Sequence, residues 1–169
     1  MNTKTAVTDA ALRRLSARVA KRLRAAGETI VTAESCTGGF IAKVLTDLPG
    51  SSDYFERGWV TYSNAAKQAE LGVESATLAR HGAVSEAVAL AMVRGALRQS
   101  GAGHAIAATG VAGPSGGSRD KPVGLVWIAW GYRRAGRNRV HATGYRFSGG
   151  RDMVRRWSVV AALKGLLES

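Results

Sequence analysis

The sequence predicts a three-layer α/β/α sandwich whose mixed, mostly parallel sheet ends in an antiparallel hairpin. Two observations support this class: short β-branched segments alternate with amphipathic helical segments, and only a polar turn separates the last two strand-like segments. A length of 169 residues fits one domain over 1–169 with a single core. The hydrophobic fraction of 46% and the charged fraction of 21% exclude disordered and fibrous classes.

Apolar residues that recur every three or four positions predict the helices. The first helix is expected to run from a cap at Thr8 to Gly27, because a glycine readily adopts the left-handed backbone that ends a helix. The other helices are expected over 40–48, over 64–72 with Asn64 as cap, over 75–80, from Ser85 to near Gly101, and from about Arg151 onward.

Short runs rich in β-branched and apolar residues predict the strands. They are expected over 28–33, 58–63, 104–109, 123–132 and 139–147, with a polar turn at 133–138. Ligands of such sheets bind beyond the carboxyl ends of the strands. Three loops therefore qualify as the binding edge: 34–39, 62–67 and 109–117.

The net charge of +12 is confined to the two ends of the chain. Residues 1–27 hold seven basic side chains against one acidic, residues 131–169 hold nine against two, and the middle is nearly neutral. In the first segment the basic residues alternate with leucines and valines at helical spacing, and no aromatic residues lie among them to stack on bases. We interpret this pattern as a solvated helix face. The alternative function is a basic nucleic-acid-binding or regulatory module without catalytic activity.

Other classes of site have little support in the sequence. A single cysteine, Cys36, and three histidines offer no zinc-binding spacing, so we expect no metal site and no cofactor. No run approaches the ~20 apolar residues that a membrane span needs, and the polar N-terminus does not resemble a secretory signal. We therefore expect a cytoplasmic protein without membrane association.

Ser35 lies where a predicted strand ends and a helix begins. Its hydroxyl is expected near the unpaired backbone N–H groups of the first helical turn, which favour developing negative charge. That arrangement suits a nucleophile in acyl transfer, although a serine at this position also serves simply as a helix cap. Cys36 is the rival nucleophile, or a small core residue.

A serine nucleophile needs a base, and Lys67 lies one turn beyond the end of the second predicted strand. To act as a base at neutral pH, a lysine must have a pKa well below its ordinary value of about 10.4. Tyr62 is placed to relay the proton. The alternative for Lys67 is an ordinary surface lysine.

A glycine-rich loop at 109–117 follows the third predicted strand. Glycines in such a place let backbone N–H groups approach an anion, although a flexible surface loop has the same composition. Arg151, which opens the last helix, is a candidate second phosphate contact or else a helix-face arginine.

Several motifs in one order resemble the CinA C-terminal domain family, whose members act as nicotinamide-nucleotide amidohydrolases. The motifs are TAESCTGG (32–39), GWVTYSN (58–64) with Lys67, HGAVSE (81–86), TGVAGP (109–114) with Gly116 and Gly117, and KPVG (121–124). The resemblance covers most of the chain. It implies deamidation of nicotinamide mononucleotide to nicotinic acid mononucleotide and ammonia, in pyridine nucleotide salvage.

The resemblance also assigns roles to residues. Ser35, Lys67 and Tyr62 fall on the catalytic positions of the family. The residues expected to bind substrate are Glu34, Cys36, Thr37, Gly38, Gly39, Thr109, Gly110, Ala112, Gly113 and Arg151. The expected partner is the small-molecule substrate rather than nucleic acid, and we expect a homodimer.

Overall fold

The computed structural model describes residues 6–134 and 136–168, and it contains a five-stranded sheet in the order β2-β1-β3-β4-β5. The strands are β1 (Ile30–Glu34), β2 (Phe55–Val60), β3 (His104–Gly110), β4 (Leu125–Arg134) and β5 (Arg137–Arg146). β1 pairs in parallel with β2 and β3, whereas β4 runs antiparallel to both β3 and β5. The prediction of a mixed sheet ending in an antiparallel hairpin is confirmed.

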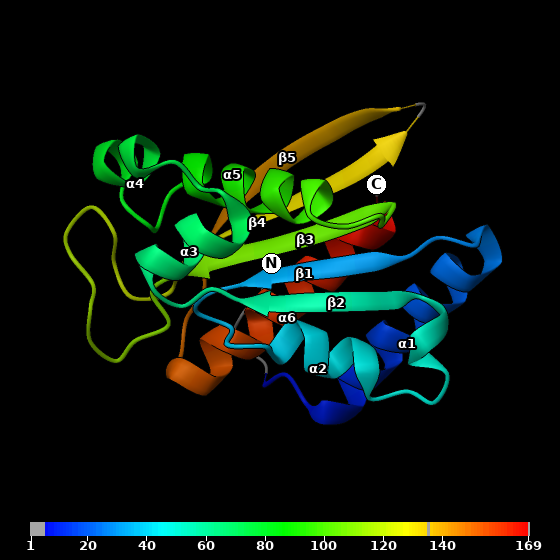
Figure 1. Cartoon of the computed structure of the whole chain (residues 1–169). Coiled ribbons are helices and arrows are strands. Elements are labelled where there is room, and N and C mark those ends of the chain that lie inside the picture. Colours follow the sequence, from blue (N-terminus) through cyan, green and yellow to red (C-terminus); the bar gives the residue numbers. More distant parts are fainter. Residues whose placement is uncertain (1–5, 135, 169) are drawn as a thin grey trace.

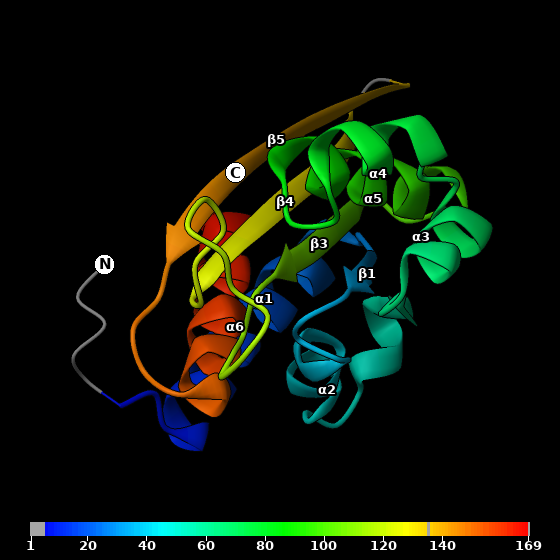
Figure 2. The same ribbon diagram turned by 90° about the vertical axis from the view of Figure 1, so that its left-hand side faces the viewer.

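Helices cover both faces of this sheet, as Figure 2 shows. One face carries α1 (Asp9–Ala26), α2 (Phe40–Thr46) and α6 (Arg151–Glu168), and the other carries α3 (Asn64–Leu71), α4 (Ser75–His81) and α5 (Glu86–Arg98). A short 3-10 turn, η1 (Ser51–Asp53), precedes β2. Each face has its own cluster of buried apolar side chains. The structure therefore has the three layers that the sequence predicts.

Local chemistry sets the element ends, with small departures from the prediction. α1 starts at the predicted cap, because Thr8 Oγ1 accepts a hydrogen bond from the Ala11 N–H, and it ends at Gly27. α3 is capped by Ser63 rather than by Asn64: Ser63 Oγ accepts from the Ala66 N–H. β2 ends at Val60, ahead of this cap, and it begins earlier than predicted, at Phe55.

The terminal hairpin also differs slightly from the prediction. Its strands extend to Arg134 and from Arg137, so the predicted turn at 133–138 is shorter, and Ala135 within it lies outside the described residues.

The carboxyl ends of β1, β2 and β3 point to the same edge of the sheet, on the left in Figure 1, where the loop at 111–124 also projects. The three loops that the sequence singles out therefore meet at one edge. None of the helices that the structure describes is long and apolar enough to cross a membrane.

Candidate active site

Ser35 follows β1 directly and opens a tight turn before α2. Its N–H donates to Ala108 O of β3 at 2.9 Å, and its carbonyl accepts from the Gly38 N–H at 3.0 Å. Gly38 and Gly39 have φ values of +58° and +87°, in the left-handed region that favours glycine. Because Gly39, not Ser35, occupies the cap position of α2, the serine hydroxyl is not used as a helix cap.

The capping function belongs to Glu34. Its fully buried carboxylate accepts hydrogen bonds from the N–H groups of Ile41 at 3.0 Å and Ala42 at 2.8 Å. A negative charge at a helix N-terminus is favourable. Glu34, predicted to bind substrate, is therefore used within the protein to hold α2 against the end of β1.

Lys67 reaches Ser35 from α3. Its Nζ lies 3.0 Å from Ser35 Oγ and donates to the carbonyl oxygens of Thr61 at 2.8 Å and Tyr62 at 3.3 Å. The residue is only 1% exposed, so it is not an ordinary surface lysine. Burial lowers the pKa of the Lys67 ammonium. No carboxylate of the described residues lies within ion-pair distance of Nζ to oppose that effect.

Tyr62, which the sequence predicts as a proton relay, lines the same cavity as Ser35 and Lys67. Its side chain is 57% exposed, and its hydroxyl accepts a hydrogen bond of 2.8 Å from Arg151. The contact between Tyr62 and Lys67 goes through the tyrosine carbonyl, not through the phenol. The same Arg151 guanidinium donates to Gly113 O at 2.9 Å. Arg151 therefore joins the glycine-rich loop to Tyr62 across the site.

These side chains line a cavity of about 280 Å³. The lining residues are Ser35, Cys36, Tyr62, Lys67, Ala83, Val84, Thr109, Gly110, Val111, Ala112, Gly113, Ser115, Gly116 and Arg151. Nine of them are predicted site residues, whereas Glu34, Thr37, Gly38 and Gly39 lie outside the lining. A size of this order suits part of a nucleotide-sized ligand rather than a macromolecule.

Sequence reasoning missed the wall formed by Ala83 and Val84. Thr109 Oγ1 donates to Ala83 O at 2.8 Å, which fastens this wall to the end of β3. The sequence contains an indication of this wall, because both residues belong to the HGAVSE motif, but no residue of that motif was predicted to line the site.

The rival nucleophile, Cys36, also lines the cavity, but burial raises the pKa of its thiol to about 12. The reactive form of cysteine is the thiolate, which is scarce at neutral pH when the pKa is so high. In addition, the side chain that Lys67 Nζ contacts is that of Ser35, through its hydroxyl. Serine is therefore the better nucleophile on both counts.

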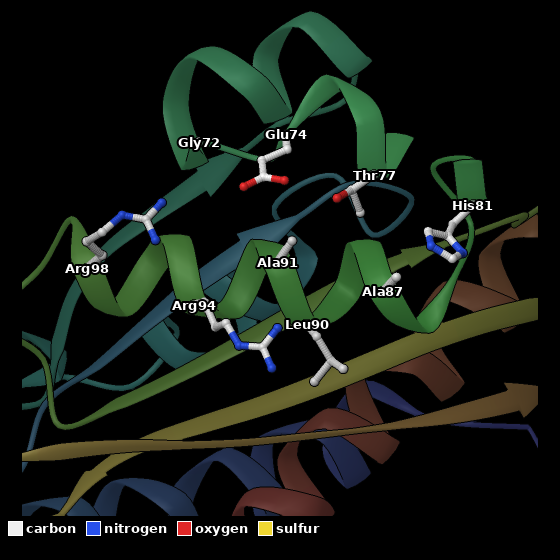
Figure 3. Close-up of a pocket in the computed structure, with 9 residues that line it drawn as sticks. All are labelled: Gly72, Glu74, Thr77, His81, Ala87, Leu90, Ala91, Arg94 and Arg98. Atoms are coloured by element: carbon white, nitrogen blue, oxygen red, sulfur yellow. The ribbon is translucent and has the colours of Figure 1, made fainter. Parts of the chain in front are cut away.

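A second and larger hollow, of about 440 Å³, lies between α4 and α5 (Figure 3). Figure 3 shows Glu74 and Thr77 facing the α5 side chains Ala87 and Ala91. No serine, cysteine or lysine lines this hollow, so it lacks the nucleophile and base that the smaller cavity has. Within 6–134 and 136–168, no three His, Cys, Asp or Glu side chains gather in a way that could hold a metal ion.

Comparison with known proteins finds relatives that match nearly the whole chain. The family model of the CinA C-terminal domain matches residues 12–169. "Nicotinamide-nucleotide amidohydrolase PncC" of Escherichia coli K12 is 52% identical over 161 residues, covering 95% of each chain. The Pseudomonas putida protein of the same name is 52% identical over 91% of this chain and 94% of its own length.

Two further relatives extend the comparison. A "CinA-like protein" of Geobacter sulfurreducens is 52% identical over 88% of this chain, but only 35% of its own length aligns. Among solved structures, the competence/damage inducible protein CihA of Agrobacterium tumefaciens superposes with a TM-score of 0.90 at 43% identity, covering 98% of each chain.

Proposed function

The chain belongs to the CinA C-terminal domain family, and we propose that it hydrolyses the carboxamide of nicotinamide mononucleotide to nicotinic acid mononucleotide and ammonia. The relatives named for this activity match the chain over nearly its whole length and theirs. The observation that carries the chemistry is the contact of Ser35 Oγ with the buried Lys67 amine inside a cavity. We assign Ser35 as nucleophile and Lys67 as base.

The hydrogen bonds of Lys67 suit it to accept a proton. In the neutral amine, two N–H bonds are directed to the carbonyl oxygens of Thr61 and Tyr62. The remaining lone pair then faces Ser35, whose O–H can donate to it. Lowering of the Lys67 pKa by burial increases the fraction of enzyme in this form.

The first half-reaction acylates the serine. Ser35 Oγ attacks the carboxamide carbon while its proton moves to Lys67 Nζ, giving a tetrahedral oxyanion. The Lys67 ammonium then protonates the departing –NH₂ group, and ammonia leaves. Among the residues that the structure describes, the N–H groups of Cys36 and Thr37 make no backbone hydrogen bond. Cys36 lines the cavity and Thr37 follows it in the same turn, directly behind the lining, so we assign these two N–H groups as the candidate donors to the oxyanion.

The second half-reaction releases the acid. A water molecule gives a proton to Lys67 and attacks the acyl carbon, and collapse of the second oxyanion breaks the bond to Ser35 Oγ. Lys67 returns the proton to the serine. The product is released as a carboxylic acid, which loses its proton to solvent to become the carboxylate, and the free serine hydroxyl is restored.

We assign the phosphate end of the substrate to the glycine-rich loop and Arg151. Gly110, Ala112, Gly113 and Gly116 line the cavity on this side. Arg151 is exposed and is already directed toward Gly113 by its hydrogen bond. A guanidinium beside a loop of glycines offers both charge and backbone donors to a phosphate group.

The test is ammonia release measured in parallel on nicotinamide mononucleotide, nicotinamide and glutamine. We expect the mononucleotide to be preferred, with activity retained after EDTA treatment and in moderate salt. Preference for glutamine would overturn the substrate assignment. Activity lost to EDTA and restored by a divalent ion would overturn the mechanism. We further propose a cytoplasmic homodimer, which light scattering of the purified protein would test.

A further inference from the structure

Arg155 holds the turn that carries the nucleophile, from the outside. This residue lies on α6, four positions after Arg151, and its Nη2 and Nε both donate to Thr37 O, at 2.8 and 3.3 Å. Its guanidinium also lies over the Phe40 ring, 5.5 Å from the centroid. Arg155 does not line the catalytic cavity. It therefore contacts the turn without reaching the space where the substrate binds.

The turn from Ser35 to Gly39 is anchored mainly at its two ends, where the Ser35 N–H donates to Ala108 O and Gly39 O accepts from the Lys43 N–H. Its own hydrogen bonds are Gly38 N–H to Ser35 O and Phe40 N–H to Thr37 O. Two consecutive glycines with positive φ give its exit more freedom than other residues would. Glu34 fixes the start of α2 beyond the turn. Arg155 adds a contact at the middle of the turn from another element, because its side chain donates to Thr37 O.

The position of Thr37 matters because its N–H is a candidate donor to the oxyanion. The Thr37 carbonyl and N–H belong to the same residue, so fixing the carbonyl restricts the φ and ψ angles that aim the N–H. Arg155 has no carboxylate partner within ion-pair distance among the described residues. Its two donors are thus directed to this one carbonyl.

We propose that Arg155 is a positioning residue, which acts through Thr37 O to aim the backbone N–H groups after Ser35 at the oxyanion. This inference rests on the proposed amidohydrolase function. Arg155 acts in the transition state, when the negative charge forms, and not in substrate binding. Its loss should therefore lower kcat and leave KM nearly unchanged.

The experiment compares Arg155→Ala and Arg155→Lys with Arg156→Ala as the matched control. Arg156 is the next residue on α6 and also lies over Phe40, at 5.8 Å, but its hydrogen bonds go to Asp9, Asp152 and Val7 O. The Arg156 variant should lose thermal stability and keep its kcat. Ammonia release from nicotinamide mononucleotide, the pH profile and the melting temperature are measured for all proteins.

We expect Arg155→Ala to lower kcat by about 10- to 100-fold, as a displaced reacting geometry does, with KM within about threefold of wild type. The pH profile should keep its apparent pKa, because the surroundings of Lys67 do not change. Arg155→Lys retains a cationic donor but not the two N–H donors of the guanidinium, so its kcat should lie between that of Arg155→Ala and that of the wild type.

Other outcomes overturn the inference. A folded Arg155→Ala protein with wild-type kcat would remove the positioning role, and a rise in KM alone would make Arg155 a substrate contact. A shifted pH profile would mean that Arg155 acts on Lys67. These outcomes are distinct from failure of the proposed function, in which the wild-type protein itself releases no ammonia from the mononucleotide.

Discussion

Lys67 Nζ lies 3.0 Å from Ser35 Oγ, although 32 positions separate the two residues in the sequence. Strand pairing brings them together: β1 and β2 are parallel neighbours, and just beyond them the Thr61 N–H donates to Glu34 O at 2.8 Å. Ser35 directly follows Glu34 at the end of β1. Lys67 lies in the first turn of α3, shortly after Thr61, and its side chain reaches Ser35 beyond the ends of the two strands. The geometry of the pair is therefore a property of the sheet edge, not of a flexible loop.

Ser35→Ala should abolish deamidation and leave the fold intact. The hydroxyl is the attacking group, yet it caps no helix, so its removal costs little stability. Activity is measured by ammonia release and folding by circular dichroism. The matched control is Cys36→Ala, which should retain most activity because the thiol is protonated at neutral pH. Near-normal turnover by Ser35→Ala would remove Ser35 as nucleophile.

Lys67→Arg should lose nearly as much kcat as Lys67→Ala. A guanidinium keeps its proton at every relevant pH and cannot accept one from Ser35. A lysine that only attracted the substrate phosphate would behave differently, since arginine would replace it and alanine would chiefly raise KM. Steady-state kinetics of both variants separate the two roles. A kcat for Lys67→Arg within a few-fold of wild type would exclude Lys67 as the base.

The order of elements and the binding edge could be predicted from the sequence because both depend on local patterns. The alternation of strands and helices fixed which loops would share an edge, and the structure brings Ser35, Lys67 and Tyr62 together there. The roles of individual side chains depend on contacts between distant segments. Residue spacing could not predict that the hydroxyl of Tyr62 binds Arg151, 89 positions away.

Glu34 and Arg155 both show that a residue's position in the sequence is a poor guide to the contacts of its side chain. Glu34 stands next to the nucleophile in the motif, yet its carboxylate turns away to cap α2. Arg155 lies 118 positions from Thr37 and had no motif to indicate it, yet it contacts the nucleophile turn. A residue's position in the sequence therefore does not determine which segment its side chain contacts.

The pH dependence of both activity and stability should report the buried Lys67. The value of kcat/KM should rise with pH through an apparent pKa below the ordinary lysine value of 10.5, since only the neutral amine accepts a proton. Because burial lowers this pKa in the folded state, the unfolded chain holds more protons between the folded and unfolded values. The free energy of unfolding should therefore rise with pH across that window.

A Lys67→Met variant isolates this effect on stability. The variant lacks the titrating amine, so any stability advantage it has over wild type should shrink as the pH rises toward 10. Tyr54 and Tyr145, whose pKa values are raised by burial, contribute equally to both proteins. Urea unfolding at several pH values supplies the comparison. A constant difference between the two proteins would show that Lys67 keeps its ordinary pKa.

Arg151→Ala should raise KM for nicotinamide mononucleotide more than it lowers kcat. The variant loses the guanidinium that joins Tyr62 Oη to Gly113 O and faces the proposed phosphate position. Nicotinamide, which has no phosphate, provides the internal control: its turnover should be unaffected. An equal loss with both substrates would place the effect of Arg151 on the chemical step instead.

Glu34→Gln should lower stability rather than substrate affinity. The wild-type carboxylate accepts from both Ile41 and Ala42, whereas an amide offers one oxygen and turns an –NH₂ group toward the other donor. Leaving one buried N–H unsatisfied costs about 1–3 kcal/mol, which corresponds to a melting temperature lower by roughly 2–4 °C per kcal/mol for a chain of this size. The control is Glu70→Gln on the exposed face of α3, expected to change stability by less than about 0.5 kcal/mol. If Glu34 instead bound substrate, the variant would melt like wild type and show a raised KM, so thermal unfolding and kinetics together decide between capping and binding.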